Sequence, residues 1–169
     1  MMIKYLAEKP REALISCGAL NAVLAYVLLF AASSLVYADE YKVKRVVDGD
    51  TIELEEIGKV RLIGVDTPET KHPRKPVECF GPEASKFTKK MMEGKVARIK
   101  YGKKKTGKYG RVLGYIYLLD GTFLNAEIIK QGYGKAYLKY PFKYSQEFKE
   151  YEEVAQSHGK GLWTACKKP

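Results

Sequence analysis

Three apolar segments follow one another too closely to be joined by anything other than tight turns. Asp-Gly and Gly-Lys pairs between alternating segments are typical of β-hairpins. Parallel strands need crossover connections of a dozen or more residues, so this spacing disfavours an all-parallel α/β fold. The sequence instead predicts an antiparallel meander, with strands at residues 41–47, 51–57 and 60–65 and turns at residues 48–50 and 58–59.

The residues after the meander change character twice. Residues 66–80 are basic and rich in proline, and a long irregular loop within a small domain is more often functional than accidental. A helix is predicted to begin at Gly81, because proline suits the first helical turn and Glu83 favours the positive end of the helix dipole. Its apolar stripe is formed by Ala84, Phe87 and Met91.

Two further strands and two further helices complete the pattern. We expect strands at 96–101 and 111–119 separated by a turn at 102–110, a helix at 123–130, a helix capped by Ser145, and packing of residues 162–163 on the core. Five short strands interrupted by a helix are typical of a small Greek-key barrel, of which the OB-fold is the common member. The predicted fold class is therefore mainly β with about three helices (α+β), as a five-stranded OB-fold barrel.

The N-terminal residues form a separate segment. Residues 13–38 carry no charge and end in a small-x-small pattern, Val36-Tyr37-Ala38, which is typical of a signal-peptide cleavage site. The stretch also reaches the ~20 apolar residues that span a bilayer. We therefore expect residues 1–38 to be either a cleaved signal peptide or a retained membrane anchor. The folded domain, residues 39–169, is expected to be secreted or to lie in the cell envelope.

The charge of the predicted domain favours a polyanionic partner. Residues 1–38 contain three basic and two acidic side chains, so residues 39–169 have 27 Lys and Arg against 18 Asp and Glu, a net charge of +9. Most of the 13 tyrosines follow residue 100 and lie among lysines, a mixture found in proteins that bind single-stranded nucleic acids. An ordinary basic secreted protein with tyrosines packed on a sheet is the alternative.

The cysteines are consistent with an oxidising compartment. Cys17 lies in the export segment, which leaves Cys79 and Cys166 as a pair in the domain. A disulfide between them is the hypothesis, and two free thiols are the alternative. Neither cysteine has a further Cys or His at metal-ligand spacing, so a metal role is not predicted for them.

Acidic residues are predicted to converge at one end of the barrel. Asp50 begins the second strand and Asp66 follows the third, so antiparallel pairing brings both to the same end. Converging carboxylates raise one another's pKa unless a cation neutralises them. No His or Cys accompanies them, and oxygen ligands select Ca²⁺ or Mg²⁺ over zinc or copper. A site with few carboxylates favours Ca²⁺ slightly.

Two arginines and a third acid extend this constellation. Arg61 lies inside the third strand and Arg111 opens the fifth, so each is either an exposed surface residue or a group directed at the same end. Planar guanidinium groups bind two phosphate oxygens at once and stabilise charge that grows in the transition state. Glu69 is close enough in sequence to Asp66 to act as a general base or to position a water.

Three of these segments resemble the thermonuclease (staphylococcal nuclease-like) family almost letter for letter. They are VDTPETKHP at 65–73, GPEAS at 81–85 and KYGR at 108–111, and the similarity extends over nearly all of residues 41–163. Each motif alone is weak evidence, but their combination is highly specific.

The resemblance implies an OB-fold phosphodiesterase that requires Ca²⁺ and cleaves DNA and RNA to 3′-phosphate products. The resemblance implies that Ca²⁺ is bound by the side chains of Asp50 and Asp66 and by the carbonyl of Thr67. It implies that Glu69 handles the attacking water and that Arg61 and Arg111 bind the phosphate. Substrate contacts are implied for Lys108, Tyr109 and Tyr137. Residues 134–140 depart from the family spacing by one residue, so the roles of Tyr137 and Tyr140 are the least determined.

The alternative function is a non-catalytic OB-fold module that binds nucleic acid. All six expected catalytic and metal positions hold competent residues, whereas a module that had lost catalysis is expected to have lost some of them. We expect a monomer, with a possible membrane tether through residues 13–38.

Overall fold

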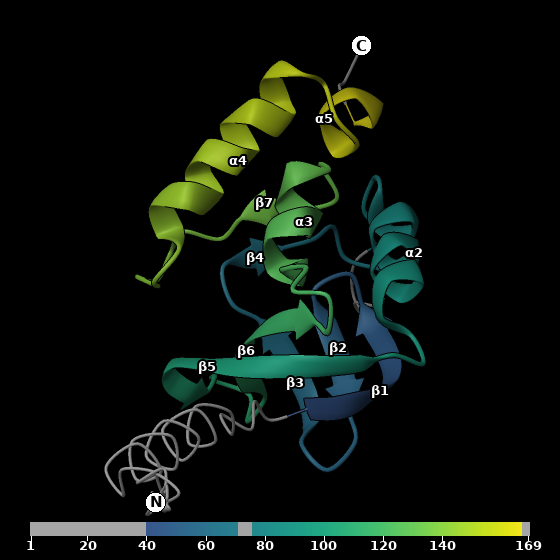
Figure 1. The fold of residues 1–169 in the computed structure, drawn as a ribbon. Coiled ribbons are helices and arrows are strands. Elements are labelled where there is room, and N and C mark those ends of the chain that lie inside the picture. The colour runs from purple at the N-terminus through teal and green to yellow at the C-terminus, as the bar shows by residue number, and fades with distance from the viewer. Residues whose placement is uncertain (1–39, 71–75, 167–169) are drawn as a thin grey trace, which may run out of the picture. The chain divides into compact units, whose positions relative to one another are not determined.

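The computed structural model describes residues 40–70 and 76–166, and the predicted export segment lies outside them (Figure 1). No helix in this described part is long and apolar enough to cross a membrane. The strands are β1 (Glu40–Asp48), β2 (Thr51–Leu54), β3 (Gly58–Leu62), β4 (Val65–Asp66), β5 (Val96–Thr106), β6 (Val112–Leu118) and β7 (Lys135–Ala136). The helices are α2 (Gly81–Met92), α3 (Leu124–Lys130), α4 (Ser145–Ser157) and α5 (Leu162–Ala165).

Five strands form a closed barrel in the order β1-β2-β3-β6-β5. The predicted meander is confirmed, because β1 pairs with β2 and β2 with β3, both antiparallel, with Ile52 opposite Val46 on one side and Val60 on the other. The barrel closes through antiparallel β1–β5 pairing and through parallel pairing of β3 with β6. This mixed sheet and the helices around it confirm the α+β class (Figure 1).

Several element boundaries differ from the predictions. The turn expected at residues 58–59 lies instead at 55–57, because β2 ends at Leu54 and its partner Gly58 already begins β3. The expected turn at residues 102–110 is shorter, because β5 continues past an irregularity until Thr106 pairs with Val112. The expected third strand is interrupted after Leu62. Gly64 has a positive φ of 75°, and the residues that follow it form β4, which pairs with β7 instead of the barrel. Ser145 is not the cap of α4, since the helix begins at Ser145 and its N-cap residue Tyr144 makes no side-chain capping bond.

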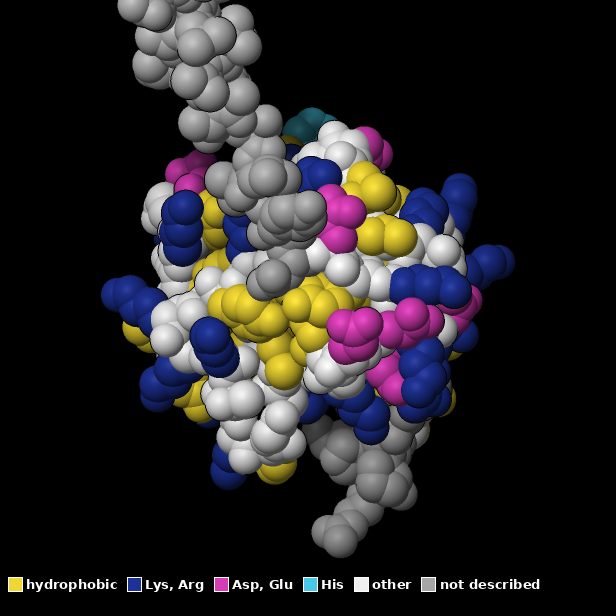
Figure 2. All heavy atoms as spheres, turned by 60° about the horizontal axis from the view of Figure 1, so that its bottom comes forward, with side chains coloured by type: hydrophobic (Ala, Val, Ile, Leu, Met, Phe, Trp, Pro, Cys, Tyr) yellow, Lys and Arg dark blue, Asp and Glu magenta, His cyan; other side chains and the backbone are white. Residues whose placement is uncertain are grey.

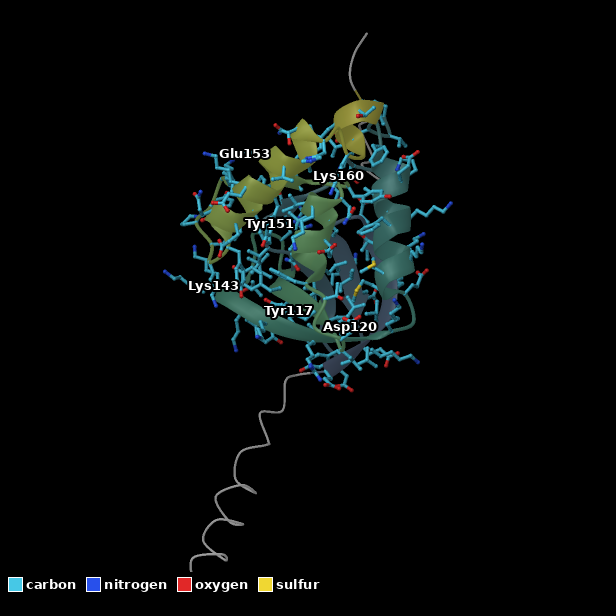
Figure 3. All side chains as sticks on the ribbon, turned by 45° about the horizontal axis from the view of Figure 1, so that its top comes forward. Tyr117, Asp120, Lys143, Tyr151, Glu153 and Lys160 are labelled. Atoms are coloured by element: carbon cyan, nitrogen blue, oxygen red, sulfur yellow. A yellow bond between two sulfur atoms is a disulfide. The ribbon has the colours of Figure 1, made fainter. Side chains whose placement is uncertain are left out.

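The core fills the barrel and the space beneath the helices. Its fully buried members include Ile52, Val60 and Ile116 from the barrel, Ile128 from α3 and Phe148 from α4. Burial of such side chains contributes about 1.5–3 kcal/mol each. Tyr151 lies on the side of α4 that faces α3 and packs against the same core (Figure 3).

The predicted helix start at Gly81 and its apolar stripe are confirmed. Ala84 is fully buried, and Phe87 packs against the core at its edge. The Phe87 ring stacks on Tyr133 at 4.2 Å between centroids, and Phe80, the residue before α2, stacks on the same tyrosine at 5.5 Å. These contacts attach the start of α2 to the segment that leads into β7.

Buried Asn125 fixes the end of the barrel that carries β4. From α3 its side-chain amide donates to the carbonyls of Ile63 and Gly114 at 3.0 and 3.3 Å, and its oxygen accepts the Ile116 N–H at 2.9 Å. Where strands end, their buried backbone N–H and C=O groups need hydrogen-bond partners other than a neighbouring strand. One amide therefore sets where the chain leaves β3 for β4.

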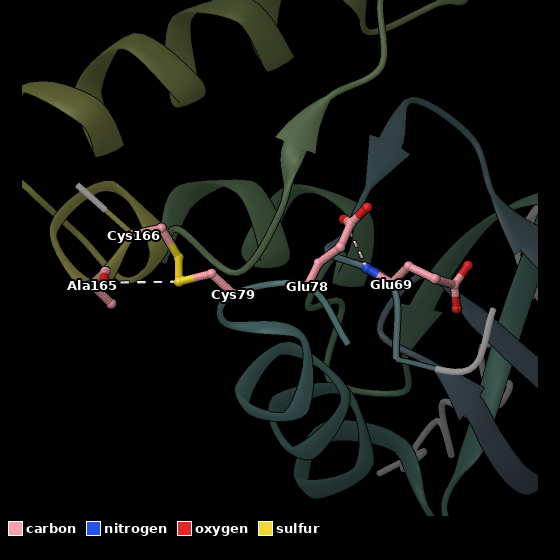
Figure 4. The surroundings of a disulfide bond; sticks show 5 residues. All are labelled: Glu69, Glu78, Cys79, Ala165 and Cys166. Atoms are coloured by element: carbon pink, nitrogen blue, oxygen red, sulfur yellow. Dashed lines mark hydrogen bonds between the residues drawn. A yellow bond between two sulfur atoms is a disulfide. The ribbon is translucent and has the colours of Figure 1, made fainter. Parts of the chain in front are cut away.

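Cys79 and Cys166 form a disulfide bond, as hypothesised (Figure 4). The bond joins positions 87 residues apart, from the loop before α2 to the residue that follows α5. In the chain-entropy model, a crosslink over such a loop contributes roughly 4–5 kcal/mol to the free energy of unfolding. The C-terminal helix is thereby held to the loop that contains Glu78.

The domain surface is strongly basic. On the face shown in Figure 2, Lys and Arg side chains lie on both sides, whereas acidic side chains gather mainly on one. The far end of β5 contributes the exposed Lys103, Lys104 and Lys105. Such a surface attracts polyanions over distances of a Debye length, about 8–10 Å at physiological salt.

Candidate active site

The turn between β1 and β2 is pressed against the end of β4. A Cβ atom at Gly49 would lie 2.6 Å from the Thr67 Oγ1 atom, so only glycine permits this close approach. From α2, the buried Thr88 hydroxyl donates a hydrogen bond to the Gly49 carbonyl at 2.6 Å. The turn is therefore held between a helix and a strand, with the acids on either side of Gly49 at fixed positions.

Asp50 is buried and has three partners. Its carboxylate accepts hydrogen bonds from the Thr51 hydroxyl at 3.0 Å and from the Thr67 backbone N–H at 3.1 Å. It also forms an ion pair with the guanidinium of Arg61. A buried carboxylate requires such charge-assisted partners to remain ionised.

Arg61 lies opposite Thr51 on the neighbouring strand and joins two acids. Besides Asp50, its guanidinium contacts the Asp66 carboxylate at 2.9 Å. Asp50 is 8% exposed in its side chain and Asp66 is 53% exposed, so the guanidinium connects an interior carboxylate to a surface one. The predicted convergence of Asp50 and Asp66 at one barrel end is thus present in the structure. Of the two alternatives for Arg61, the structure shows the group directed at that end.

Burial lowers the pKa of the Arg61 guanidinium, while the neighbouring Asp66 carboxylate opposes this shift. The positive charge of Arg111 lowers this pKa further, which places the second arginine within electrostatic range of the first. An arginine stays protonated despite such shifts. Two guanidinium groups therefore repel each other here, and an anion between them would relieve the repulsion.

The pairing of β3 with β6 determines the position of Arg111. Val112 pairs with Val60, so the residue just before β6 lies next to the strand that carries Arg61. The Arg111 guanidinium lies 5.8 Å from the centre of the Tyr109 ring, and Lys108 Nζ lies 5.7 Å from the same ring. Tyr109 is 75% exposed, so this turn presents an aromatic face and two cations to solvent.

Asp48 is a site residue that the sequence reasoning treated only as part of a turn. Its carboxylate accepts hydrogen bonds from the Gly49 N–H at 2.9 Å and the Thr70 hydroxyl at 2.8 Å. Burial raises the pKa of Asp48, and the adjacent Glu69 carboxyl, which shares a hydrogen bond with it, raises this pKa further. The sequence did contain a pattern that could have identified Asp48, because Asp48 and Asp50 are two residues apart and flank the glycine of the turn.

Glu69 is held through its backbone by Glu78. The Glu69 N–H donates to the Glu78 carboxylate at 3.1 Å, and the Glu78 N–H donates to the Glu69 carbonyl at 2.9 Å (Figure 4). Glu78 was not anticipated, because an acid in a proline-rich loop carries no periodic or motif signal. The Glu69 side chain points away from this contact (Figure 4) and meets Asp48.

Tyr137 lies beside the site through the small β4–β7 sheet. Asp66 pairs with Lys135 across this sheet, and the Tyr137 N–H donates to the Gly64 carbonyl at 2.9 Å. Tyr137 is 37% exposed and its ring centre lies 6.1 Å from that of Tyr140, which is 63% exposed. Two exposed aromatic rings thus stand next to the strand that carries Asp66.

The donor set at this barrel end suits a hard cation. Asp50 and Asp66 are close enough for one guanidinium to contact both. The Thr67 hydroxyl oxygen beside them is buried and has no hydrogen-bond partner among the described residues. Within the same part of the chain, no three His, Cys, Asp or Glu side chains converge as a ready metal site. The fit is therefore to an oxygen-only site of two carboxylates completed by backbone and water, as Ca²⁺ accepts.

A pocket of about 250 Å³ adjoins the site on the side of the disulfide. Asp66 and Thr67 form one wall, and Glu78 with the Cys79–Cys166 bond forms another. The disulfide and the acid that contacts Arg61 therefore line the same pocket.

The chain is similar to known proteins over most of its length. The family model described as "Staphylococcal nuclease homologue" matches residues 59–165. The chain is 40% identical to proteins named Thermonuclease from Staphylococcus hyicus, over 80% of this chain and 83% of that protein, and from Staphylococcus intermedius, over 78% and 80%. It is 36% identical to Endonuclease YncB of Bacillus subtilis (strain 168), over 71% of this chain and 59% of that protein.

Proposed function

The chain belongs to the staphylococcal nuclease homologue family, and from that premise we propose that it is an exported, Ca²⁺-dependent nuclease that hydrolyses DNA and RNA. The observation that carries this proposal is the contact of one guanidinium, Arg61, with both Asp50 and Asp66 at the barrel end that Arg111 also approaches. The closed barrel order supports assignment of the OB-fold.

The two arginines are proposed to bind the scissile phosphate. Arg61 uses part of its guanidinium on Asp50 and Asp66, but a guanidinium has five N–H donors, so donors remain for an anion. Arg111 has no ion-pair partner among the described residues. Both groups would stabilise negative charge as it grows on the phosphoryl oxygens, which is the largest contribution such donors make.

Glu69 is proposed to take a proton from the attacking water. The water oxygen bonds to phosphorus and the bond from phosphorus to the 5′ oxygen breaks. The leaving oxygen takes a proton from solvent, and Glu69 releases its proton to solvent, giving 3′-phosphate and 5′-hydroxyl ends. Asp50, Asp66 and the Thr67 carbonyl would hold Ca²⁺, which neutralises phosphate charge and activates water when bound. The Asp48 carboxyl, in contact with Glu69, would hold the Glu69 side chain in place.

Lys108, Tyr109 and Tyr137 are proposed to bind neighbouring nucleotides. Tyr109 and Tyr137 are exposed rings, one next to Arg111 and the other beside β4, and a base stacked on an aromatic ring contributes about 1–3 kcal/mol. Stacking needs unpaired bases, so single strands should be favoured. We further propose that the domain comprises residues 39–169, that it acts as a monomer outside the cytoplasm, and that residues 1–38 are its export signal or tether.

The proposal is tested by digesting plasmid DNA and RNA with the purified protein in Ca²⁺, in Mg²⁺ and in chelator. We expect cleavage in Ca²⁺ and none in chelator. The DNA ends should be extended by a polymerase only after a phosphatase has removed their 3′-phosphates. Binding of an oligonucleotide without any cleavage in Ca²⁺ would instead identify a non-catalytic binding module.

Replacing Asp66 with asparagine tests the cation site directly. We expect Ca²⁺ affinity, measured by calorimetry, and the cleavage rate to fall together by at least about tenfold, because a carboxylate charge is lost from a site with only two. The fold should persist, since Asp66 is exposed. Asp120→Asn, at the turn after β6 (Figure 3), is the matched control. Equal Ca²⁺ affinity in Asp66→Asn and the wild type would remove Asp66 from the site.

A further inference from the structure

The backbone of Glu69 is fixed by Glu78, a residue of the loop before α2. Glu78 accepts the Glu69 N–H with its carboxylate and donates its own N–H to the Glu69 carbonyl (Figure 4). Two reciprocal hydrogen bonds restrain both the position and the orientation of the Glu69 peptide. Glu78 can thus influence the site through Glu69, whose side chain points away from it (Figure 4).

Glu78 is itself anchored by the residue that follows it. Cys79 is bonded to Cys166, which directly follows α5, and Phe80 stacks on Tyr133. The α5 helix is in turn fixed to the domain, because Leu162 is 5% exposed and its N–H donates to the Gly132 carbonyl at 2.9 Å. A continuous chain of contacts therefore leads from the core through the disulfide to Glu69.

We propose that Glu78 is a positioning residue for Glu69, and that the Cys79–Cys166 disulfide holds Glu78 in place. The proposal rests on the role given to Glu69 under the proposed function. A displacement of about 1 Å in a catalytic group can cost about a hundredfold in rate, and supporting contacts decide whether a site is held closely enough. Because Glu78 does not touch substrate, its loss should lower kcat and leave KM nearly unchanged.

Substitutions at Glu78 separate positioning from general stability. Glu78→Ala is expected to lower kcat at least about tenfold with KM changed less than twofold. Glu78→Gln should retain most of the activity, because its amide oxygen still accepts the Glu69 N–H. Glu78 is exposed, so neither variant should disturb the core, and Glu83→Ala on the first turn of α2 is the matched acidic control. A wild-type kcat in Glu78→Ala overturns the proposal.

A double-mutant cycle shows whether Glu78 acts through Glu69. In a Glu69→Ala background, adding Glu78→Ala should lower the residual kcat by less than twofold, because there is no carboxylate left to position. An equal loss in both backgrounds would mean that Glu78 acts elsewhere, and would overturn the proposal.

Amide hydrogen exchange tests the contact without reference to cleavage. Exchange of the Glu69 amide should accelerate at least about tenfold in Glu78→Ala and severalfold in the Cys79→Ser/Cys166→Ser variant, with the Ile52 amide in the barrel unchanged. An unchanged Glu69 amide in Glu78→Ala overturns the proposal at any rate of cleavage. A wild-type protein that does not cleave in Ca²⁺ overturns the proposed function instead. If the double cysteine variant does not fold, the Glu78 variants decide, since their disulfide is intact.

Discussion

Replacing Arg111 with alanine is expected to lower the rate of phosphodiester cleavage about a thousandfold while leaving the fold intact. Loss of one donor aimed at developing negative charge costs about 10²–10³ in rate, and loss of an arginine on a transferring phosphoryl group costs about 10³–10⁵. Arg111 is half-buried, and its guanidinium lies over the ring of exposed Tyr109. The folded state therefore loses little when this side chain is removed.

Steady-state cleavage of a short oligonucleotide and thermal unfolding of the same sample measure the two effects separately. Arg98→Ala is the matched control, because Arg98 is a half-buried arginine on β5, as Arg111 is half-buried, and its ion pair with Glu40 is distant in sequence from the site motifs. It should cleave at the wild-type rate. Cleavage by Arg111→Ala within tenfold of the wild type would exclude Arg111 from the mechanism.

Replacing Arg61 with alanine is expected to abolish cleavage and also to destabilise the protein in the absence of Ca²⁺. Arg61 is 18% exposed in its side chain and pairs with Asp50, which is more deeply buried. Removing one partner of a buried ion pair leaves an uncompensated charge, and typically costs about 3–5 kcal/mol of the free energy of unfolding. Arg111→Ala should show no comparable loss of unfolding free energy. The stability of the two variants therefore distinguishes the roles of the two arginines.

Urea unfolding with chelator and with Ca²⁺ measures this difference. Ca²⁺ should restore part of the stability of Arg61→Ala, because a bound cation would neutralise the same two carboxylates. The Asp50→Asn/Arg61→Ala double variant should be more stable in chelator than Arg61→Ala alone, since the unpaired charge is gone. A wild-type urea midpoint for Arg61→Ala in chelator would contradict the role of Arg61 as the counter-ion of Asp50.

Local sequence patterns were sufficient to predict the meander and the convergence of Asp50 and Asp66 at one end of it. Short turns force antiparallel pairing of β1, β2 and β3, so Asp50 and Asp66 had to meet near Arg61, and the structure confirms that they do. The disulfide hypothesis and the family membership are likewise confirmed. The residue roles, the Ca²⁺ requirement and the export segment stay predictions.

The features that sequence did not predict depend on contacts between distant segments. The parallel pairing of β3 with β6 places Arg111 near Arg61, yet nothing local in either strand specifies it. The β4–β7 sheet consists of two residues on each side, which is too short to leave a periodic pattern. Glu78 acquires its significance only because the loop folds back to bring it to Glu69.

The crosslink between residues 79 and 166 also determines what a protease can do to this protein. The exposed lysines at the end of β5 are an accessible place for a trypsin-like cut. A cut there would separate the segment with Glu69 from the segment with Arg111 in the polypeptide. Because both positions of the disulfide flank that cut, the two fragments would remain one covalent molecule until the bond was reduced. The two halves of the site would therefore stay together after a single cleavage of the backbone.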